Sequence, residues 1–259
     1  MKLWIQTSGA IGADPAWEDY DRLLNAHFRQ VARPGTEICL HGSRVYSPAI
    51  VTHQYPAHLH TSLVVEAALQ AEREGYDAFV QTGSFDLGFL EIRELVEIPV
   101  VFPIETALHI ATLLAPQVAF LTQNRPFLNR LNQRARAYGF GDRLTPGGWV
   151  DLTPRELQLA FKNPGPTIDL LAAEAKKIGE QGANVLICAG NMMTMLFVSQ
   201  GTTEIEGVRI LDSLGILVKM AEMMVDLHQT MGITRRRMGM YAPLPKEEIR
   251  SMRKLYGVE

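Results

Sequence analysis

Two short turns rich in small residues carry the groups in this 259-residue chain that could do chemistry. The first turn, Thr82-Gly83-Ser84, follows the apolar run 76–80, and the second, Ala189-Gly190-Asn191, follows the apolar run 185–188. A strand, a small-residue turn and a helix in this order leave backbone N–H groups free to hold an anionic group. The sequence therefore predicts substrate-binding positions at Gly83, Ser84, Gly190 and Asn191.

The two turns belong to an internal repeat. Laid over one another without a gap, the two copies pair glycine with glycine and one polar residue with another: Gly83 with Gly190, and Ser84 with Asn191. Each copy continues into an apolar strand and then a long apolar helix. Strands alternating with helices indicate an α/β protein. We therefore expect two lobes whose turns face each other across one small-molecule site.

Other polar residues follow predicted strands or lie in the longest irregular stretch. Ser8 follows the first strand and Thr122 follows the strand 118–121, so both could line the same cleft, although Ser8 can equally be an ordinary turn residue. The stretch 41–60 holds His53, and long loops often form active-site walls. His53 can equally be a surface residue. The histidines of this loop lack acidic or cysteine partners at ligand spacing, so we expect no metal.

Composition excludes several functional classes. A formal net charge of -3 with 20% charged residues gives no electrostatic case for binding nucleic acid or an anionic membrane. One basic cluster, 235–237, is interpreted as a solvated turn. Two cysteines, Cys39 and Cys188, exclude a disulfide scaffold and a cysteine-rich zinc site. No apolar run reaches membrane-spanning length and the first residues lack a signal-peptide pattern, so a cytoplasmic protein is expected.

Motifs around the turns carry a family resemblance. They are Gly75-Tyr76-Asp77-Ala78, Gly182-Ala183-Asn184-Val185, Ile98-Pro99-Val100-Val101 with Glu105-Thr106-Ala107-Leu108-His109, and Gly207-Val208-Arg209-Ile210-Leu211-Asp212. In these motifs the chain resembles the aspartate/glutamate racemase superfamily, particularly its hydantoin racemase and arylmalonate decarboxylase branches. The resemblance implies two similar, pseudo-twofold-related α/β lobes, each with a parallel four-stranded sheet flanked by helices. It also implies an active site between the lobes and no cofactor.

The sequence departs from that family at the reacting groups. The racemases have a cysteine at each turn, because inversion requires an acid and a base on opposite faces of the α-carbon. Counted from Asp77, the first cysteine falls on Gly83. The second position stays open: Cys188-Ala189-Gly190 resembles the family's Cys-Ala-Gly, whereas counting from Asn184 and the internal repeat both place Gly190 there. A two-thiol racemase is not expected on either alignment.

Three kinds of function stay open. The first is a cofactor-independent enzyme that acts on a small carboxylate or cyclic amide through an enolate or carbanion. By family it is a racemase or isomerase, and with Cys188 in the cleft it is a one-base lyase of the decarboxylase type. If Cys188 is buried, Asp86 with His53 as partner could activate water and give a hydrolase of an amide or cyclic imide, although Asp86 can instead be a helix N-terminal charge. The third is a non-catalytic small-carboxylate binding protein.

The domain prediction places residues 1–116, with about 212–234, in the first lobe and 117–211 in the second. Residues 235–259 form a C-terminal tail that contains Pro243 and Pro245. A Pro-bounded apolar tail often docks on a neighbour, so we expect a homo-oligomer, with wrapping of its own subunit as the alternative.

Overall fold

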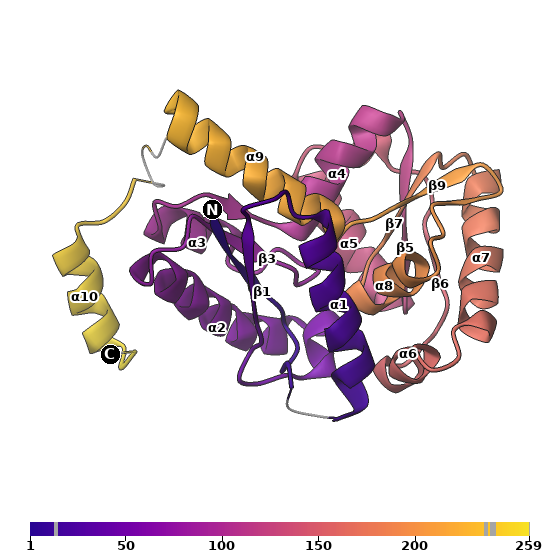
Figure 1. Cartoon of the computed structure of the whole chain (residues 1–259), viewed down its shortest axis with the longest axis horizontal. Helices are drawn as coiled ribbons and strands as arrows, with labels where there is room; N and C mark the ends of the chain where they lie inside the picture. Colours follow the sequence, from indigo (N-terminus) through magenta and orange to yellow (C-terminus); the bar gives the residue numbers. More distant parts are fainter. Residues whose placement is uncertain (13–14, 236–237, 239–241, 259) are drawn as a thin grey trace.

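Two β-sheets lie side by side in the computed structural model, which describes residues 1–12, 15–235, 238 and 242–258 (Figure 1). Sheet A has the order β2-β1-β3-β4 and sheet B the order β6-β5-β7-β9-β8. The strands of sheet A are β1 (Lys2–Gln6), β2 (Glu37–His41), β3 (Ala78–Gln81) and β4 (Val100–Val101). Those of sheet B are β5 (Val118–Thr122), β6 (Gly148–Trp149), β7 (Val185–Cys188), β8 (Glu204–Ile205) and β9 (Val208–Leu211).

Parallel pairing confirms the predicted α/β class. All pairs in sheet A are parallel, and so are the pairs that join β6, β5, β7 and β9. Sheet B also contains a fifth strand, because β8 pairs antiparallel with β9 through a tight hairpin. A strand of two residues has too little alternation to be predicted from its sequence pattern.

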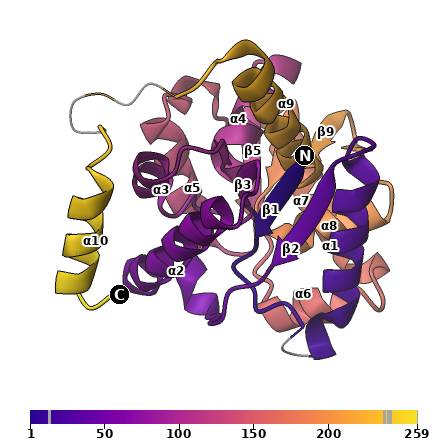
Figure 2. The ribbon, with the colours of Figure 1, turned by 60° about the vertical axis from the view of Figure 1, so that its left-hand side comes forward.

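Helices cover both faces of each sheet. They are α1 (Glu18–Val31), α2 (Gln54–Arg73), α3 (Phe89–Leu95), α4 (Pro103–Leu114), α5 (Arg125–Ala137), α6 (Pro154–Ala160), α7 (Gly165–Glu180), α8 (Asn191–Ser199), α9 (Gly215–Met231) and α10 (Lys246–Leu255). On sheet A, α2 lies on one face, and α1 and α9 lie on the other (Figure 2). On sheet B, α4 and α5 contact β5 from one side, and α7 covers the other.

Two helices cross from one lobe to the other. The helix α4 follows β4 of sheet A but packs on β5 and β7, whereas α9 follows β9 of sheet B but packs on β3 and β4. A single core therefore spans both sheets, with Val80, Met193 and Val218 in one buried cluster. The predicted boundaries at 116 and 211 did not include the crossing of α4, which places residues 103–114 against sheet B.

The long stretch 41–60 is less irregular than expected. Helix α2 begins at Gln54, so the loop between β2 and α2 ends at His53, and a short 3-10 turn, Pro48–Val51, lies within it. Pro56 occupies the third position of this helix, where a missing N–H costs no intrahelical hydrogen bond.

The C-terminal part of the chain bears on two expectations, a solvated turn at the basic cluster 235–237 and a docking tail. Arg235 donates to the carbonyl oxygens of Arg93, Val96 and Ile98 and so closes the end of α3. Arg236 and Arg237 of the basic cluster, and Met240 and Tyr241 of the predicted tail, lie outside the described residues.

Across the described ranges, none of the helices has both the length and the apolar character needed to cross a membrane.

Candidate active site

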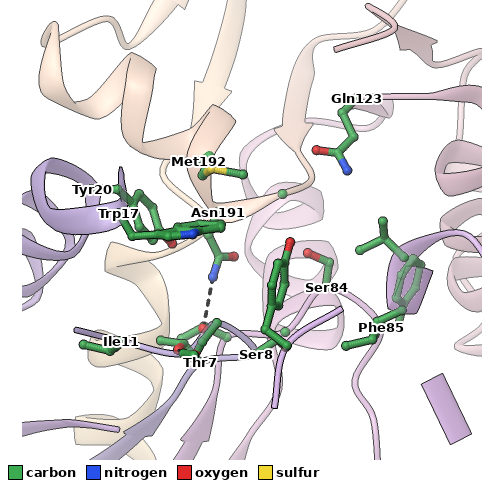
Figure 3. A pocket seen from close by; sticks show the side chains of 18 of the residues that line it. Thr7, Ser8, Ile11, Trp17, Tyr20, Ser84, Phe85, Gln123, Asn191 and Met192 are labelled. Carbon is green, nitrogen blue, oxygen red and sulfur yellow. Dashed lines mark hydrogen bonds between the residues drawn. The ribbon is translucent and has the colours of Figure 1, made fainter. Parts of the chain in front are cut away.

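A pocket lies where the carboxyl ends of β1, β3, β5 and β7 meet, and residues of both turns line it (Figure 3). Parallel strands bring their carboxyl ends to one edge of a sheet, which is where open α/β proteins bind ligands. The pocket is open to solvent, and the cavity itself has a volume of about 100 Å³. Among the predicted site residues, those that line it are Ser8, Gly83, Ser84, Gly190 and Asn191.

The start of α8 supplies hydrogen-bond donors to this pocket. Gly190 is the N-cap residue with φ of 110°, and no side chain caps the helix. The first N–H groups of a helix have no partner within it and carry partial positive charge. Asn191 is held in place, because its Nδ2 donates to Thr82 Oγ1 at 3.0 Å. This end of the pocket therefore favours an oxygen that gains negative charge.

Ser8 occupies the space beside Gly83. A Cβ atom added at Gly83 would lie 2.5 Å from Ser8 Oγ. The Ser8 hydroxyl therefore fills the side of the first turn on which a side chain at position 83 would project. At Gly190 an added Cβ would meet only the Phe127 ring, at 3.8 Å, but the positive φ disfavours any residue other than glycine.

The remaining walls are aromatic and aliphatic. Trp17 packs edge-on against Tyr20 and Tyr46, with ring centroids 5.8 and 5.5 Å apart, and Phe85 faces Phe127 at 4.8 Å. Burial raises the pKa of both tyrosines, so each hydroxyl stays protonated at neutral pH. These walls suit a ligand with an apolar substituent.

Asp21 is the one lining residue, in the described part of the chain, whose side chain ionises at neutral pH. Its Oδ2 accepts a hydrogen bond of 3.1 Å from Gly12 N. Burial raises the pKa of this carboxyl, and the Gly12 N–H partly offsets that rise.

Arg130 supports two walls of the pocket from the second lobe. It projects from α5, donates from Nη1 to Ile50 O at 2.7 Å, and lies 3.9 Å from the centroid of the Phe85 ring. Both Ile50 and Phe85 line the pocket. The lobes are therefore bound together at the site itself.

Cys188 lies in β7 and faces the core. It is 1% exposed, and burial raises the pKa of its thiol far above neutrality. It borders a small separate cavity behind the turns, together with Ser213 and Leu214. A neutral buried thiol is a poor base. The structure thus places Gly190, and not Cys188, at the turn that faces the pocket.

Asp86 and His53 do not meet in the pocket. The Asp86 carboxylate is 1% exposed and accepts hydrogen bonds from Ile104 N at 2.9 Å, Glu105 N at 3.0 Å and Tyr138 Oη at 2.8 Å. It therefore caps α4 on the far side of the first turn. His53 is exposed and its Nδ1 bonds Thr52 Oγ1 at 2.8 Å. The structure therefore contradicts the predicted pairing of Asp86 with His53.

Thr122 also differs from its predicted place. It is fully buried, and its Oγ1 donates to Asn124 O at 2.8 Å. Gln123 lines the pocket in its stead, because neighbouring residues of an extended strand point in opposite directions.

Several lining residues were not foreseen as site residues: Trp17, Tyr20, Asp21, Tyr46 and Gln123. Three of them come from the start of the first helix, where charged and aromatic residues look like ordinary first-turn and core residues. The available signal was the long loop 41–60, which holds Tyr46. Among the described residues, no group of three His, Cys, Asp or Glu could hold a metal ion.

Comparison with known proteins shows that the chain is similar to racemases. A family model described as Asp/Glu/Hydantoin racemase matches residues 15–221. A hydantoin racemase from Pseudomonas sp. (strain NS671) is 28% identical over 207 residues, which cover 77% of this chain and 78% of that protein. Allantoin racemase from Klebsiella pneumoniae shares the fold with a TM-score of 0.78 and 23% identity, over 95% of this chain and 94% of its own. A mutant of arylmalonate decarboxylase shares it at a TM-score of 0.54 and 17% identity, over 87% and 93%.

Proposed function

Because the chain belongs to the Asp/Glu/hydantoin racemase family, we propose that it is a cofactor-independent enzyme that acts on a small cyclic amide or carboxylate through an enolate or carbanion. One observation carries this proposal: the two turns of the internal repeat converge on one pocket, together with the uncapped start of α8. Its curated relatives are racemases, which supports an enzymatic role and an isomerase or racemase as the general class.

The donors at the turns are suited to an enolate oxygen. Removing a proton next to a carbonyl moves negative charge onto that oxygen. Preorganised N–H groups that receive this charge can lower the barrier by several kcal/mol. The start of α8 at Asn191 and the turn at Ser84 line the pocket from opposite lobes, so both can contact one small ligand.

The charges of the pocket favour a neutral substrate. Among its described lining residues there is no Lys, Arg or His, and Asp21 adds a negative charge. A free carboxylate would have to enter beside that charge without a cationic partner, which is costly in a partly desolvated site. We therefore favour a cyclic amide with an apolar substituent over a small carboxylate.

The two glycines limit the mechanism. A thiol pair is absent, and the buried Cys188 gives little support to a one-thiol lyase. The hydrolase alternative would need a group other than Asp86 and His53 to activate water. The missing thiols favour one second candidate, a protein that binds a small ligand without converting it.

Proton NMR in D2O tests the proposal. The protein would be incubated with 5-benzylhydantoin, phenylmalonate, aspartate and glutarimide, each beside a blank without protein at the same pH. We expect the α-proton of 5-benzylhydantoin to be replaced by deuterium faster than in the blank. Ring opening without α-exchange would indicate the hydrolase, and loss of CO2 from phenylmalonate the lyase. Ligand line broadening without conversion of any compound would favour the binding protein.

A further inference from the structure

We propose that Asp21 is the group that takes the α-proton of the substrate in this pocket. The inference rests on the proposed function, since it names the base for that enolate chemistry. Asp21 stands in the first turn of α1, a position that the internal repeat and the two turns do not mark.

Elimination among the lining residues leads to Asp21. A base for an α-proton must lose its own proton near neutral pH and must reach the ligand. The other titratable lining residues in the described part of the chain are Tyr20 and Tyr46, and both stay protonated. Ser8 and Ser84 also line the pocket, but a serine hydroxyl is a poor base without an activating partner.

The position of α1 brings this carboxylate to the same site as the enolate-holding donors. Tyr20, the residue before Asp21, lines the pocket together with Asn191, the first residue of α8. Figure 3 shows Trp17 and Tyr20 beside Asn191 at one wall of the pocket. The contact between α1 and α8 thus fixes a carboxylate and a helix N-terminus around one cavity.

The environment of Asp21 suits proton transfer. The bond from Gly12 N fixes one oxygen of the carboxylate, which has about four lone-pair sites and so keeps acceptor capacity for a ligand proton. Partial burial raises the pKa of the carboxyl and makes it a stronger base than a solvated aspartate. An aspartate with a modestly raised pKa can serve as general base when donors hold the enolate oxygen.

The step balances without any further reagent. The carboxylate of Asp21 takes the α-proton, the C–H electron pair moves into the adjacent carbonyl, and the resulting enolate oxygen is held at the start of α8. Return of a proton from Asp21 restores the starting enantiomer. Delivery from water on the opposite face gives the other enantiomer, and the proton held by Asp21 neutralises the hydroxide that forms. In D2O the second route places deuterium on the α-carbon, and the first does so once the Asp21 carboxyl has exchanged its proton with solvent.

Substitution of Asp21 tests the inference with one probe, 5-benzylhydantoin. We expect Asp21→Asn to slow α-exchange by at least about 100-fold, the usual contribution of a general base. Affinity, followed through the fluorescence of Trp17 in the pocket wall, should change by less than about threefold. Asp21→Glu should recover part of the rate. Asp19→Asn, which removes the same charge two residues away and outside the pocket lining, is the matched control and should exchange like the wild type.

The outcomes separate the two proposals. An inactive wild-type protein would overturn the proposed function, and the Asp21 inference with it. Wild-type exchange that persists in Asp21→Asn would overturn the Asp21 inference alone. If Asp21→Asn loses its thermal unfolding transition, Asp21→Glu decides: its rate should rise with pH as its carboxyl ionises, and a rate that is independent of pH would contradict a carboxylate base.

Discussion

At the scale of single residues, the glycines of the two turns differ in what disfavours a side chain at their positions. Gly83 has an ordinary backbone conformation, and only the Ser8 hydroxyl occupies the space of its missing side chain. Gly190 has open space beside it but a φ of 110°. A side chain at position 83 is therefore opposed by one movable hydroxyl, whereas a side chain at 190 is opposed by the backbone itself.

This difference predicts unequal effects of the same substitution. Gly83→Ala should lower the free energy of unfolding by less than about 1 kcal/mol, because Ser8 can rotate away. Gly190→Ala should lower it by about 1–3 kcal/mol, the usual cost of a non-glycine residue in a sparsely populated backbone region. Urea unfolding of both variants measures the difference, and equal losses would contradict this account of the turns.

The sequence predicted the turn residues of the site better than its walls. The structure places Ser8, Gly83, Ser84, Gly190 and Asn191 at the pocket, although their roles stay predictions. Such residues follow from strand order alone, because parallel strands end at a common edge. Asp21 and Tyr20 come from a helix whose orientation depends on its packing against α8, which no local pattern shows.

At the scale of elements, Asp86 explains how the first turn is joined to α4. Pro103 is the first residue of that helix, and the Asp86 carboxylate accepts the N–H groups of the next two residues, Ile104 and Glu105. A carboxylate at a helix start satisfies donors that would otherwise be unpaired. The turn that lines the pocket with Ser84 is thus anchored two residues later.

Burial of this carboxyl predicts a pH-dependent stability. Burial raises the pKa of Asp86 from 3.8 to about 6, so the folded protein holds a proton that the unfolded chain releases. The associated stability is complete below about pH 4 and is lost as pH rises through about 6, by up to about 3 kcal/mol at about 1.4 kcal/mol per pKa unit. Asp86→Asn lacks this change.

Urea unfolding between pH 4 and 7 measures this effect. The wild-type free energy of unfolding should fall relative to that of Asp86→Asn as pH rises, and contributions from other groups cancel in the difference. Tyr138→Phe removes a hydrogen-bond donor that lowers the pKa of Asp86. The loss of stability in this variant should therefore extend to higher pH than in the wild type. Parallel curves for all three proteins would show that Asp86 does not titrate in this range.

Element boundaries were predictable where local chemistry determines them. The spacing of Thr153 and Glu156 is that of a capping box, and at the start of α6 Glu156 N donates to Thr153 Oγ1 at 3.2 Å and Thr153 N donates to Glu156 Oε2 at 2.7 Å. Helix α2 begins at Gln54, inside the stretch 41–60 that was expected to be irregular, because proline is tolerated in the first turn of a helix, where Pro56 lies.

At the scale of the whole molecule, reciprocal crossing makes the two lobes one unit. The crossing of α4 and α9 is reinforced by a half-buried pair, His27 Nε2 and Asp212 Oδ2, 2.8 Å apart, which joins α1 to the start of α9. Neighbouring groups hold the pKa of Asp212 below its usual value despite burial, with the His27 hydrogen bond the largest of their effects. A pocket formed by both lobes keeps its shape only if such contacts hold the lobes together.

The last helix, α10, lies outside this unit. Figure 1 shows α10 beyond α2, apart from both sheets, and none of its residues is buried. Arg253 pairs with Glu66 of α2 at 2.6 and 2.8 Å. Apolar residues at its end stay exposed, with Leu255 at 83% and Tyr256, the residue after α10, at 76%. Amphipathic helices usually bury such a stripe, so the homo-oligomer remains our expectation for this surface.

Removal of α10 tests that expectation. A chain without residues 242–259 should elute with the mass of a single chain in light scattering, whereas the full chain should form a larger assembly. Its fold should persist, because the pair of Arg253 with Glu66 is partly exposed and such pairs contribute about 0–1 kcal/mol. Leu255→Asp should dissociate the assembly as the deletion does. Lys254→Asp, which places the same residue about 100° around the axis of α10 from Leu255, should not. Single-chain mass for the unmodified protein would show that α10 serves its own subunit.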